Sequence, residues 1–226
     1  GRGLGIIDSL PLTEVPLAAQ VVEKAPNFPP EVAEGVKKWF GDYMQWMVGS
    51  TNGEELAEAN DEHGVMYWLQ VASFAKYVDD EDQLSGCRNR FKFFFLPNQM
   101  AVDGSFPHEL IRPKSYSYSI YQLDNMAALA QLLSTPAESL WQFTAPDGRN
   151  MRKAVEYLYP YLADKSKWPK STEGDTWPTR QPVLLFAGLI LDEPKYIDLW
   201  KTETPEIPSD DVGRNSAITQ PVLWLK

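Results

Sequence analysis

Two residue types that build many protein sites are scarce in this chain of 226 residues. It contains one cysteine, Cys87, and two histidines, His63 and His108. A single cysteine excludes an intrachain disulfide framework. The same counts argue against a metal site built from cysteine and histidine together. We therefore expect no metal and no other cofactor.

Long apolar runs and basic charge are lacking too. No stretch approaches the roughly 20 apolar residues that span a bilayer, and no signal peptide is visible. The 21 Lys and Arg residues against 31 Asp and Glu leave a net charge of -10. Nucleic-acid binders need a basic stripe, so we expect neither a nucleic-acid nor a membrane partner. An acidic protein can still bind a polyanion where a few cationic side chains gather in one cleft.

What is present is helical spacing along most of the chain. Apolar residues recur at steps of three and four, whereas strand signals are weak. This pattern predicts an all-α fold of helical hairpins, as in an (α/α) toroid or a helical array. Helices are expected over about 30–49, 65–77, 81–95, 120–133, 151–162 and 183–196, and an irregular tail over 203–226.

The first group of candidate site residues lies where one of these helices begins. In the segment NDEHGVMYWLQ, Asp61, Glu62 and His63 precede the first helical turn. Carboxylates favour that position, so simple helix capping explains the two acids equally well. Tyr67 and Gln70 follow His63 at i+4 and i+7, on the same helix face, which makes them candidates for substrate binding.

The second group lies in the one long stretch without helical period, residues 98–119. Loops of this kind often carry sites. If the stretch is extended, Tyr116 and Tyr118 point the same way. A cation beside a phenol favours the phenolate, which makes a tyrosine usable as a base. A loop held by an Arg112–Glu109 pair is the structural alternative. The chemistry-bearing residues here are His108, Glu109, Arg112, Lys114, Tyr116, Tyr118 and Tyr121.

These two groups, in this order, resemble the alginate lyase family of α/α-toroid polysaccharide lyases. The resemblance rests on NDEHGVMYWLQVASFAKY, where the family carries Asn-Asn-His-Gly and an aromatic helix. It also rests on DGSFPHELIRPKSYSYSIYQLDNMAALAQL, with Asp-Gly-Ser, Glu-Leu-x-Arg and a tyrosine that begins a long helix. GRGLGIIDS before them and DGRNMRKAVEYLYPYL after them are further landmarks. Because family domains are longer at the N-terminus, we expect this chain to be the C-terminal part of a single toroid domain that lacks N-terminal helices.

The resemblance implies roles for particular residues. His63 matches the active-site histidine, Arg112 the arginine of Glu-Leu-x-Arg, and Tyr118 the catalytic tyrosine. Glu62 departs from the pattern, because alginate-specific members have an asparagine that binds the substrate carboxylate. A glutamate can do so only when protonated. The expected substrate-binding residues are Tyr67, Gln70, His108, Lys114, Tyr116 and Tyr121.

The implied reaction is β-elimination on a 4-linked uronic-acid polymer, either glucuronan or mannuronate-rich alginate. Tyr118 would act as base and acid, and a periplasmic or secreted location would suit such a substrate. Two rival functions remain open at this point. One is a glycoside hydrolase on a similar helical fold. The other is a non-catalytic glycan-binding protein, which the eight tryptophans would also suit.

Overall fold

The regular structure of the described residues, 2–173, 177–205 and 216–225 of this computed structural model, is entirely helical. The prediction of an all-α fold is confirmed for them. The α-helices are α1 (Glu14–Val22), α2 (Pro30–Gly49), α3 (Thr51–Ala57), α4 (Glu62–Val78), α5 (Glu81–Arg90), α6 (Leu96–Gln99), α7 (Pro107–Leu110), α8 (Ser115–Leu133), α9 (Met151–Ala163), α10 (Pro182–Ile190) and α11 (Pro194–Thr202). Tighter or wider helical turns are η1 (Gly3–Thr13), η2 (Phe91–Phe95, a π-helical turn), η3 (Lys165–Lys167) and η4 (Pro221–Trp224).

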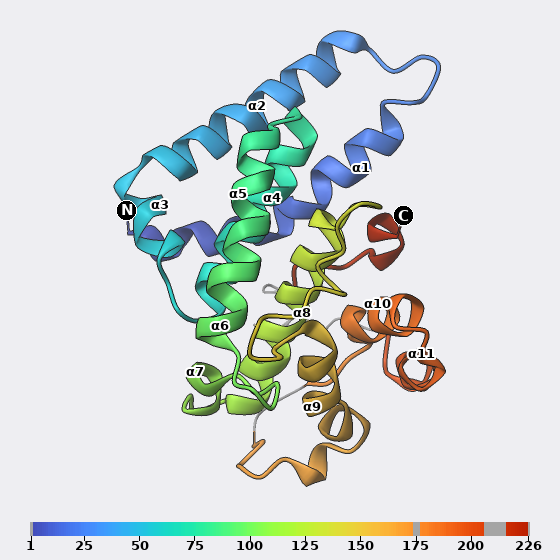
Figure 1. The fold of residues 1–226 in the computed structure, drawn as a ribbon. Helices are drawn as coiled ribbons and strands as arrows, with labels where there is room; N and C mark the ends of the chain where they lie inside the picture. The colour runs from blue at the N-terminus through green and yellow to red at the C-terminus, as the bar shows by residue number, and fades with distance from the viewer. Residues whose placement is uncertain (1, 174–176, 206–215, 226) are drawn as a thin grey trace.

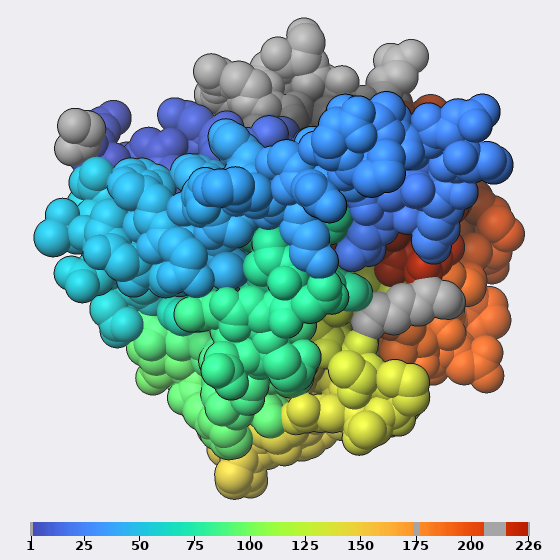
Figure 2. Space-filling view, turned by 90° about the horizontal axis from the view of Figure 1, so that it is seen from above, coloured from blue at the N-terminus to red at the C-terminus, as the bar shows by residue number. Residues whose placement is uncertain are grey.

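The helices follow one another as hairpins around two central elements, α4 and α8 (Figure 1). The α2 helix packs on α4, α4 packs on both α5 and α8, and α8 contacts α9 and α10. Seen from above, the α2 segment forms a band across the molecule (Figure 2). This arrangement of packed helical hairpins agrees with the predicted all-α fold.

The two central helices form the core because they are apolar on nearly every side. Leu69 and Phe74 of α4, and Leu123 and Met126 of α8, have no exposed surface. A helix that is apolar all round has to be covered on all sides by neighbours. No helix among the described residues is long and apolar enough to cross a membrane.

Helix α8 begins earlier than the sequence pattern predicts, at Ser115 rather than Ile120. Tyr116 and Tyr118 therefore lie in a helix, not in an extended segment. Residues two apart in a helix point to roughly opposite sides. Tyr116 is buried and its hydroxyl donates to the carbonyl of Tyr161 at 2.8 Å, whereas Tyr118 is half-buried beside Arg112. The expectation that the two phenols share a direction was wrong.

Two other predicted helices have different limits. The helix expected over 183–196 is divided between α10 and α11 because Asp192 adopts a left-handed conformation (φ 55°) and Pro194 starts a new helix. The helix expected over 81–95 does not end before Pro97. It widens into the π-helical turn η2 and continues as α6, in whose first turn Pro97 lies.

The segment expected to form an irregular tail, 203–226, is described only in part. Residues 206–215 and 226 lie outside the described residues. Residues 216–225 return to the core, where Ile218 and Trp224 are buried and η4 forms. The Glu14 carboxylate accepts hydrogen bonds from the backbone N–H of Gln220 at 2.8 Å and the indole N–H of Trp224 at 2.9 Å. These contacts attach the described part of the tail to α1.

A tight turn in the loop before α7 packs against helix α9. Gly104 has a φ of +91°, and a side chain added there would overlap the carbonyl oxygen of Lys153. Asp103 accepts hydrogen bonds from the backbone N–H (2.9 Å) and hydroxyl (2.7 Å) of Ser105. These hydrogen bonds lower the pKa of Asp103. The Asp-Gly-Ser landmark is thus a turn that positions the segment carrying Glu109 and Arg112.

We expect Gly104→Ala to destabilise the protein by about 2 kcal/mol or more, since it combines positive φ with an overlap against backbone. Gly35→Ala is the matched control, because Gly35 lies on α2 with no atom within 4 Å of the added methyl group. That control should stabilise the protein by up to about 1 kcal/mol through helix propensity. Urea denaturation of both variants measures the difference. If both variants changed the free energy of unfolding by the same amount, the proposed role of the turn would be contradicted.

Candidate active site

The candidate active site forms where the N-terminal ends of α4 and α8 meet. Asp61 is the N-cap of α4, and its carboxylate accepts the backbone N–H of His63 at 3.1 Å. This cap explains why Asp61 precedes the helix, and it places Glu62 and His63 in the first turn. The second half of the site comes from the short helix α7 and the first turn of α8, which packs on α4.

Arg112 is the centre of this cluster. Its guanidinium Nη1 lies 3.3 Å from both carboxylate oxygens of Glu62. The guanidinium carbon lies 4.0 Å from the centre of the Tyr118 ring, a cation–π contact. Asp61 and Glu109 each place a carboxylate oxygen 3.8 Å from the same Nη1 atom. A single cation therefore joins the tyrosine to three acidic groups.

His63 lies beside these acids. Its Nδ1 is 3.0 Å from Asp61 and 3.6 Å from Glu62. Burial alone would lower the pKa of His63, but the hydrogen bond to Asp61 and the charges of Glu62 and Asp61 outweigh it and raise the pKa. For Asp61, burial works towards a higher pKa, and the hydrogen bond and charge of His63 reverse it to a lower one. The pair therefore favours the charged form of His63.

Glu109 is the most buried acid of the cluster, with a side chain 1% exposed. One of its oxygens, Oε1, accepts the backbone N–H of Glu62 at 3.1 Å, and the other, Oε2, is buried without a hydrogen-bond partner among the described residues. Burial, and then the charge of Glu62, raise the pKa of Glu109 to about 9. Two carboxyls in such contact cannot both be charged, so the pair holds a proton at neutral pH.

A chain of amides supports the loop that carries Asp61. Gln122 of α8 donates from Nε2 to the Gln99 oxygen at 2.6 Å. Gln99 in turn donates to the carbonyl oxygens of Ala59 (3.3 Å) and Asp61 (3.2 Å). This path of hydrogen bonds runs from α8 to the loop, and it fixes the position of the first turn of α4 relative to α8.

Asp61, Glu62 and His63 could also offer ligands to a metal ion, since one donor atom from each lies within 4.8 Å of the others. The Arg112 guanidinium already lies within 4 Å of both carboxylates. A fixed cation at that distance repels a second one. We therefore interpret the cluster as an acid/base site and assign it no metal.

Among the residues predicted to bind substrate, three have buried side chains that hydrogen-bond to the protein. The Tyr67 hydroxyl donates to the carbonyl of Met47 at 3.0 Å. The Gln70 oxygen accepts the Ser9 hydroxyl at 2.7 Å. Tyr116 bonds the carbonyl of Tyr161, as described above. These three side chains are at most 1% exposed, so they lie in the core of the protein.

The other predicted substrate-binding residues lie around the cluster. His108 on α7 and Lys114 at the start of α8 are exposed. Tyr121 lies one turn beyond Tyr118 and lines a neighbouring cavity. The structure thus brings together the four residues predicted to be catalytic (Glu62, His63, Arg112 and Tyr118), and it distributes the predicted binding residues between rim, cavity and core.

In the lyase reaction that the resemblance implies, sequence reasoning assigned Glu109 and Asp61 no role; they were candidates only as the paired carboxylates of a glycoside hydrolase. A signal for Glu109 exists, because it precedes Arg112 by three residues in Glu-Leu-x-Arg and the two side chains meet. No spacing rule could predict its contact with Glu62, which is 47 residues away. Asp61 was interpreted as a helix cap, and the structure adds that it also orients His63.

Helical hairpins around two buried helices, with carboxyl, imidazole, guanidinium and phenol groups gathered at their N-terminal ends, define an all-α protein with an acid/base site. Comparison with known proteins identifies the family. A sequence model of the alginate lyase family matches residues 1–168. The chain belongs to the alginate lyase family.

A solved structure agrees with this assignment. The fold is similar to that of an alginate lyase from Bacteroides ovatus, with a TM-score of 0.81 and 28% sequence identity. The alignment covers 97% of this chain and 59% of the other, so the chain spans about three fifths of the length of that lyase. No curated protein matches the chain.

Proposed function

We propose that this chain carries the catalytic groups of a polysaccharide lyase that cleaves a 4-linked uronic-acid polymer by β-elimination. One observation carries the proposal: Arg112 contacts both the Tyr118 ring and the Glu62 carboxylate, which joins a proton-transfer group to a carboxyl-binding group. Family membership supports the same reaction.

The site has to perform three tasks: it neutralises the substrate carboxylate, removes the proton from C5 and donates a proton to O4. The hydrogen on C5 becomes acidic only when the neighbouring carboxylate is neutralised, and the bond to O4 breaks only if O4 gains a proton. In the proposed step, the Tyr118 phenolate removes the C5 proton. The electron pair of the C5–H bond forms the C4–C5 double bond, the C4–O4 bond breaks, and O4 takes the proton from Tyr118. No co-reactant is consumed.

Neutralisation of the substrate carboxylate is assigned to Glu62 with His63 and Arg112. The sequence-based proposal placed the required proton on Glu62 alone. The contact between Glu62 and Glu109 supports a modified version, in which the two carboxyls share it. With the shared proton on Glu62, its carboxyl can donate a hydrogen bond to the substrate carboxylate. With the proton on Glu109, Glu62 is charged, and His63 and Arg112 neutralise the substrate carboxylate instead. Glu109 acts through Glu62 and is a positioning residue.

We further propose glucuronan or mannuronate-rich alginate as the substrate. In glucuronate and mannuronate, the C5 hydrogen and O4 lie on the same side of the ring, so Tyr118 can serve both. In guluronate they lie on opposite sides, and His63 would have to be the base. A polymeric substrate of this kind also suits a periplasmic or secreted location.

The test is incubation of the purified protein with glucuronan, polymannuronate and polyguluronate, read by the ultraviolet absorbance of the new double bond. Absorbance should rise with the first two polymers. Depolymerisation without a rise in ultraviolet absorbance would identify a glycoside hydrolase. Binding without any cleavage would identify a glycan-binding protein, and either result would reject the proposed lyase reaction.

The shared proton predicts a pH dependence of stability. Folding raises the pKa of Glu109 from 4.5 to about 9. The folded protein keeps a proton that the unfolded chain loses, so this group's contribution to stability is present at low pH and lost as pH rises through that window. Glu109→Gln should make the fall in the free energy of unfolding shallower over the same window, as measured by urea denaturation.

In the Glu109→Gln variant, the new amide can donate to Glu62 and accept its N–H, as protonated Glu109 does. We therefore expect Glu109→Gln to keep activity at neutral pH, whereas Glu109→Ala should lose it. Glu34→Gln, on the exposed face of α2, is the control. It should change neither the pH dependence of stability nor the activity at neutral pH. An unaltered stability profile in Glu109→Gln, or full activity in Glu109→Ala, would contradict the shared proton.

A further inference from the structure

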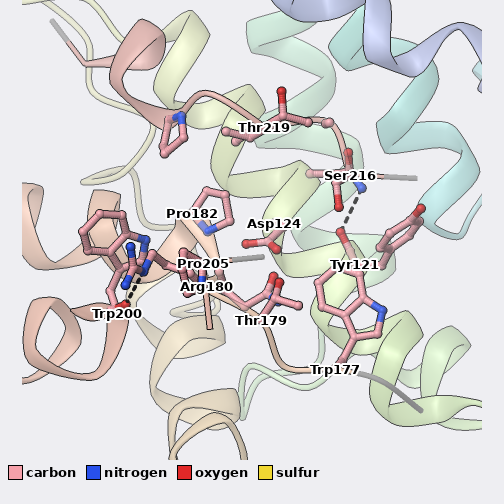
Figure 3. Close-up of a pocket in the computed structure, with 15 residues that line it drawn as sticks. Tyr121, Asp124, Trp177, Thr179, Arg180, Pro182, Trp200, Pro205, Ser216 and Thr219 are labelled. Carbon is pink, nitrogen blue, oxygen red and sulfur yellow. Dashed lines mark hydrogen bonds between the residues drawn. The ribbon is translucent and has the colours of Figure 1, made fainter. Parts of the chain in front are cut away.

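A cavity lies further along α8 than the candidate active site (Figure 3). Its volume is about 270 Å³. It is enclosed by α8, by residues 177–182 at the start of α10, by α11 and by residues 216–221. Tyr121, Asn125, Trp177 and Trp200 are among the residues that line it.

Helix α8 connects this cavity to the catalytic cluster. Tyr118, Tyr121 and Asn125 are spaced i, i+3 and i+7, so they share one face of the helix. At the helical rise, the Cα atoms of Tyr118 and Asn125 are about 10 Å apart along the axis. A polysaccharide that places one sugar at Tyr118 can therefore extend along this face and reach the cavity with a later sugar.

The cavity presents a hydrogen-bond acceptor that the described part of the chain does not satisfy. Asn125 is 1% exposed. Its Nδ2 donates to the carbonyl of Tyr121 at 2.9 Å, while its Oδ1 has no partner among the described residues. A buried amide oxygen without a hydrogen-bond partner lowers the stability of the folded protein. A ligand that donates a hydrogen bond to Asn125 recovers the lost stability.

An unsatisfied donor and two aromatic rings complete the lining. The indole N–H of Trp200 is buried and has no partner in the described ranges. A sugar hydroxyl is both donor and acceptor, so it fits a cavity that offers one group of each kind. Tyr121 and Trp177 meet edge to face, with ring centres 5.7 Å apart. Flat rings of this kind pack against the apolar face of a sugar.

Among the described residues that line the cavity, Arg180 and Asp124 are the ones that carry a basic or acidic side chain. The Arg180 guanidinium lies over the Trp200 ring, 4.8 Å from its centre, and supplies positive charge. Asp124 accepts the backbone N–H of Val183 at 3.1 Å, at the start of α10. Desolvation by the surrounding protein raises the pKa of Asp124 to about 7, which reduces its negative charge at and below neutral pH. The lining is therefore compatible with an anionic sugar.

We propose that this cavity is a distal subsite that binds a uronate ring of the polymer cleaved at Tyr118. Asn125 and Trp200 bind hydroxyl groups, Arg180 attracts the carboxylate, and Tyr121 and Trp177 pack on the ring. This assignment rests on the proposed function for the identity of the polymer.

The first test measures kcat/KM for uronan oligosaccharides of increasing length. In the unmodified protein, kcat/KM should increase when the oligosaccharide becomes long enough to reach the cavity. Asn125→Leu and Trp200→Phe should each remove about 10-fold of that increase, the equivalent of one hydrogen bond, and leave the rate on shorter oligosaccharides unchanged. Trp39→Phe, on the exposed face of α2, is the matched control.

The second test does not depend on catalysis. Calorimetry on the Tyr118→Phe variant measures binding of the long oligosaccharide with no turnover. Adding Asn125→Leu or Trp200→Phe should weaken that binding, while Trp39→Phe should not. Unchanged binding and unchanged length dependence in folded variants would overturn the subsite. Absence of unsaturated product from the unmodified protein would reject the lyase reaction instead, and calorimetry would still decide whether the cavity binds the sugar.

Discussion

Tyr118→Phe is expected to reduce formation of unsaturated product at least about 100-fold, the effect of losing a positioned acid/base group. Phenylalanine keeps the ring beneath Arg112, at 4.0 Å in the structure, so the cation–π contact and the helix start should survive. Only the hydroxyl that moves the proton is lost. Ultraviolet absorbance measures the rate, and circular dichroism checks that the fold persists.

A second tyrosine serves as control for the first prediction. Tyr159→Phe removes a hydroxyl on α9, away from the catalytic cluster, and should leave the rate within about twofold. If Tyr118→Phe retained activity comparable to that control, Tyr118 would not be the proton-transfer group.

Arg112→Ala should also lower kcat/KM by at least about 100-fold, comparable to the loss of one charge-stabilising donor in an active site. The reason is that Arg112 both offsets the Glu62 charge and orients the Tyr118 ring. The variant should be less stable as well, because Glu62 and Glu109 remain buried without their cation. Arg112→Lys should fall in between, since lysine keeps the charge but loses the planar stack and the fork of donors.

The control for this second prediction is Arg152→Ala. Arg152 lies on α9, pairs with Glu193 at 2.8 Å and is 40% exposed. Exposed pairs contribute about 0–1 kcal/mol, so its loss should change neither activity nor the melting temperature by much. Steady-state kinetics and thermal denaturation compare the two arginines. Similar kinetics for Arg112→Ala and Arg152→Ala would remove Arg112 from the proposed mechanism.

The two groups of candidate site residues were predictable because each is local. Asp61, Glu62 and His63 are consecutive, and their position before a helix follows from capping preferences. Arg112 and Tyr118 lie close together in one segment punctuated by proline. The helix limits were less predictable, since α8 begins at Ser115 and the helix expected over 183–196 is divided at Asp192. The division at Asp192 has a local cause, because Pro194 follows and starts a new helix. The early start of α8 lies where this helix packs on α7 and α4, which are contacts that helical spacing does not contain.

The sequence by itself determined the chemical groups and the helical character of this protein. Apolar spacing predicts the helices, and the residues of the two motifs supply acid, base, cation and phenol. Only the tertiary structure decided how they are coupled. The turn of α8 directs Tyr118 towards Arg112 and Tyr116 into the core, and the packing of α4 against α8 brings Glu109 to Glu62. Proton sharing depends on distance and burial, and those arise from the contact of residues far apart in the chain.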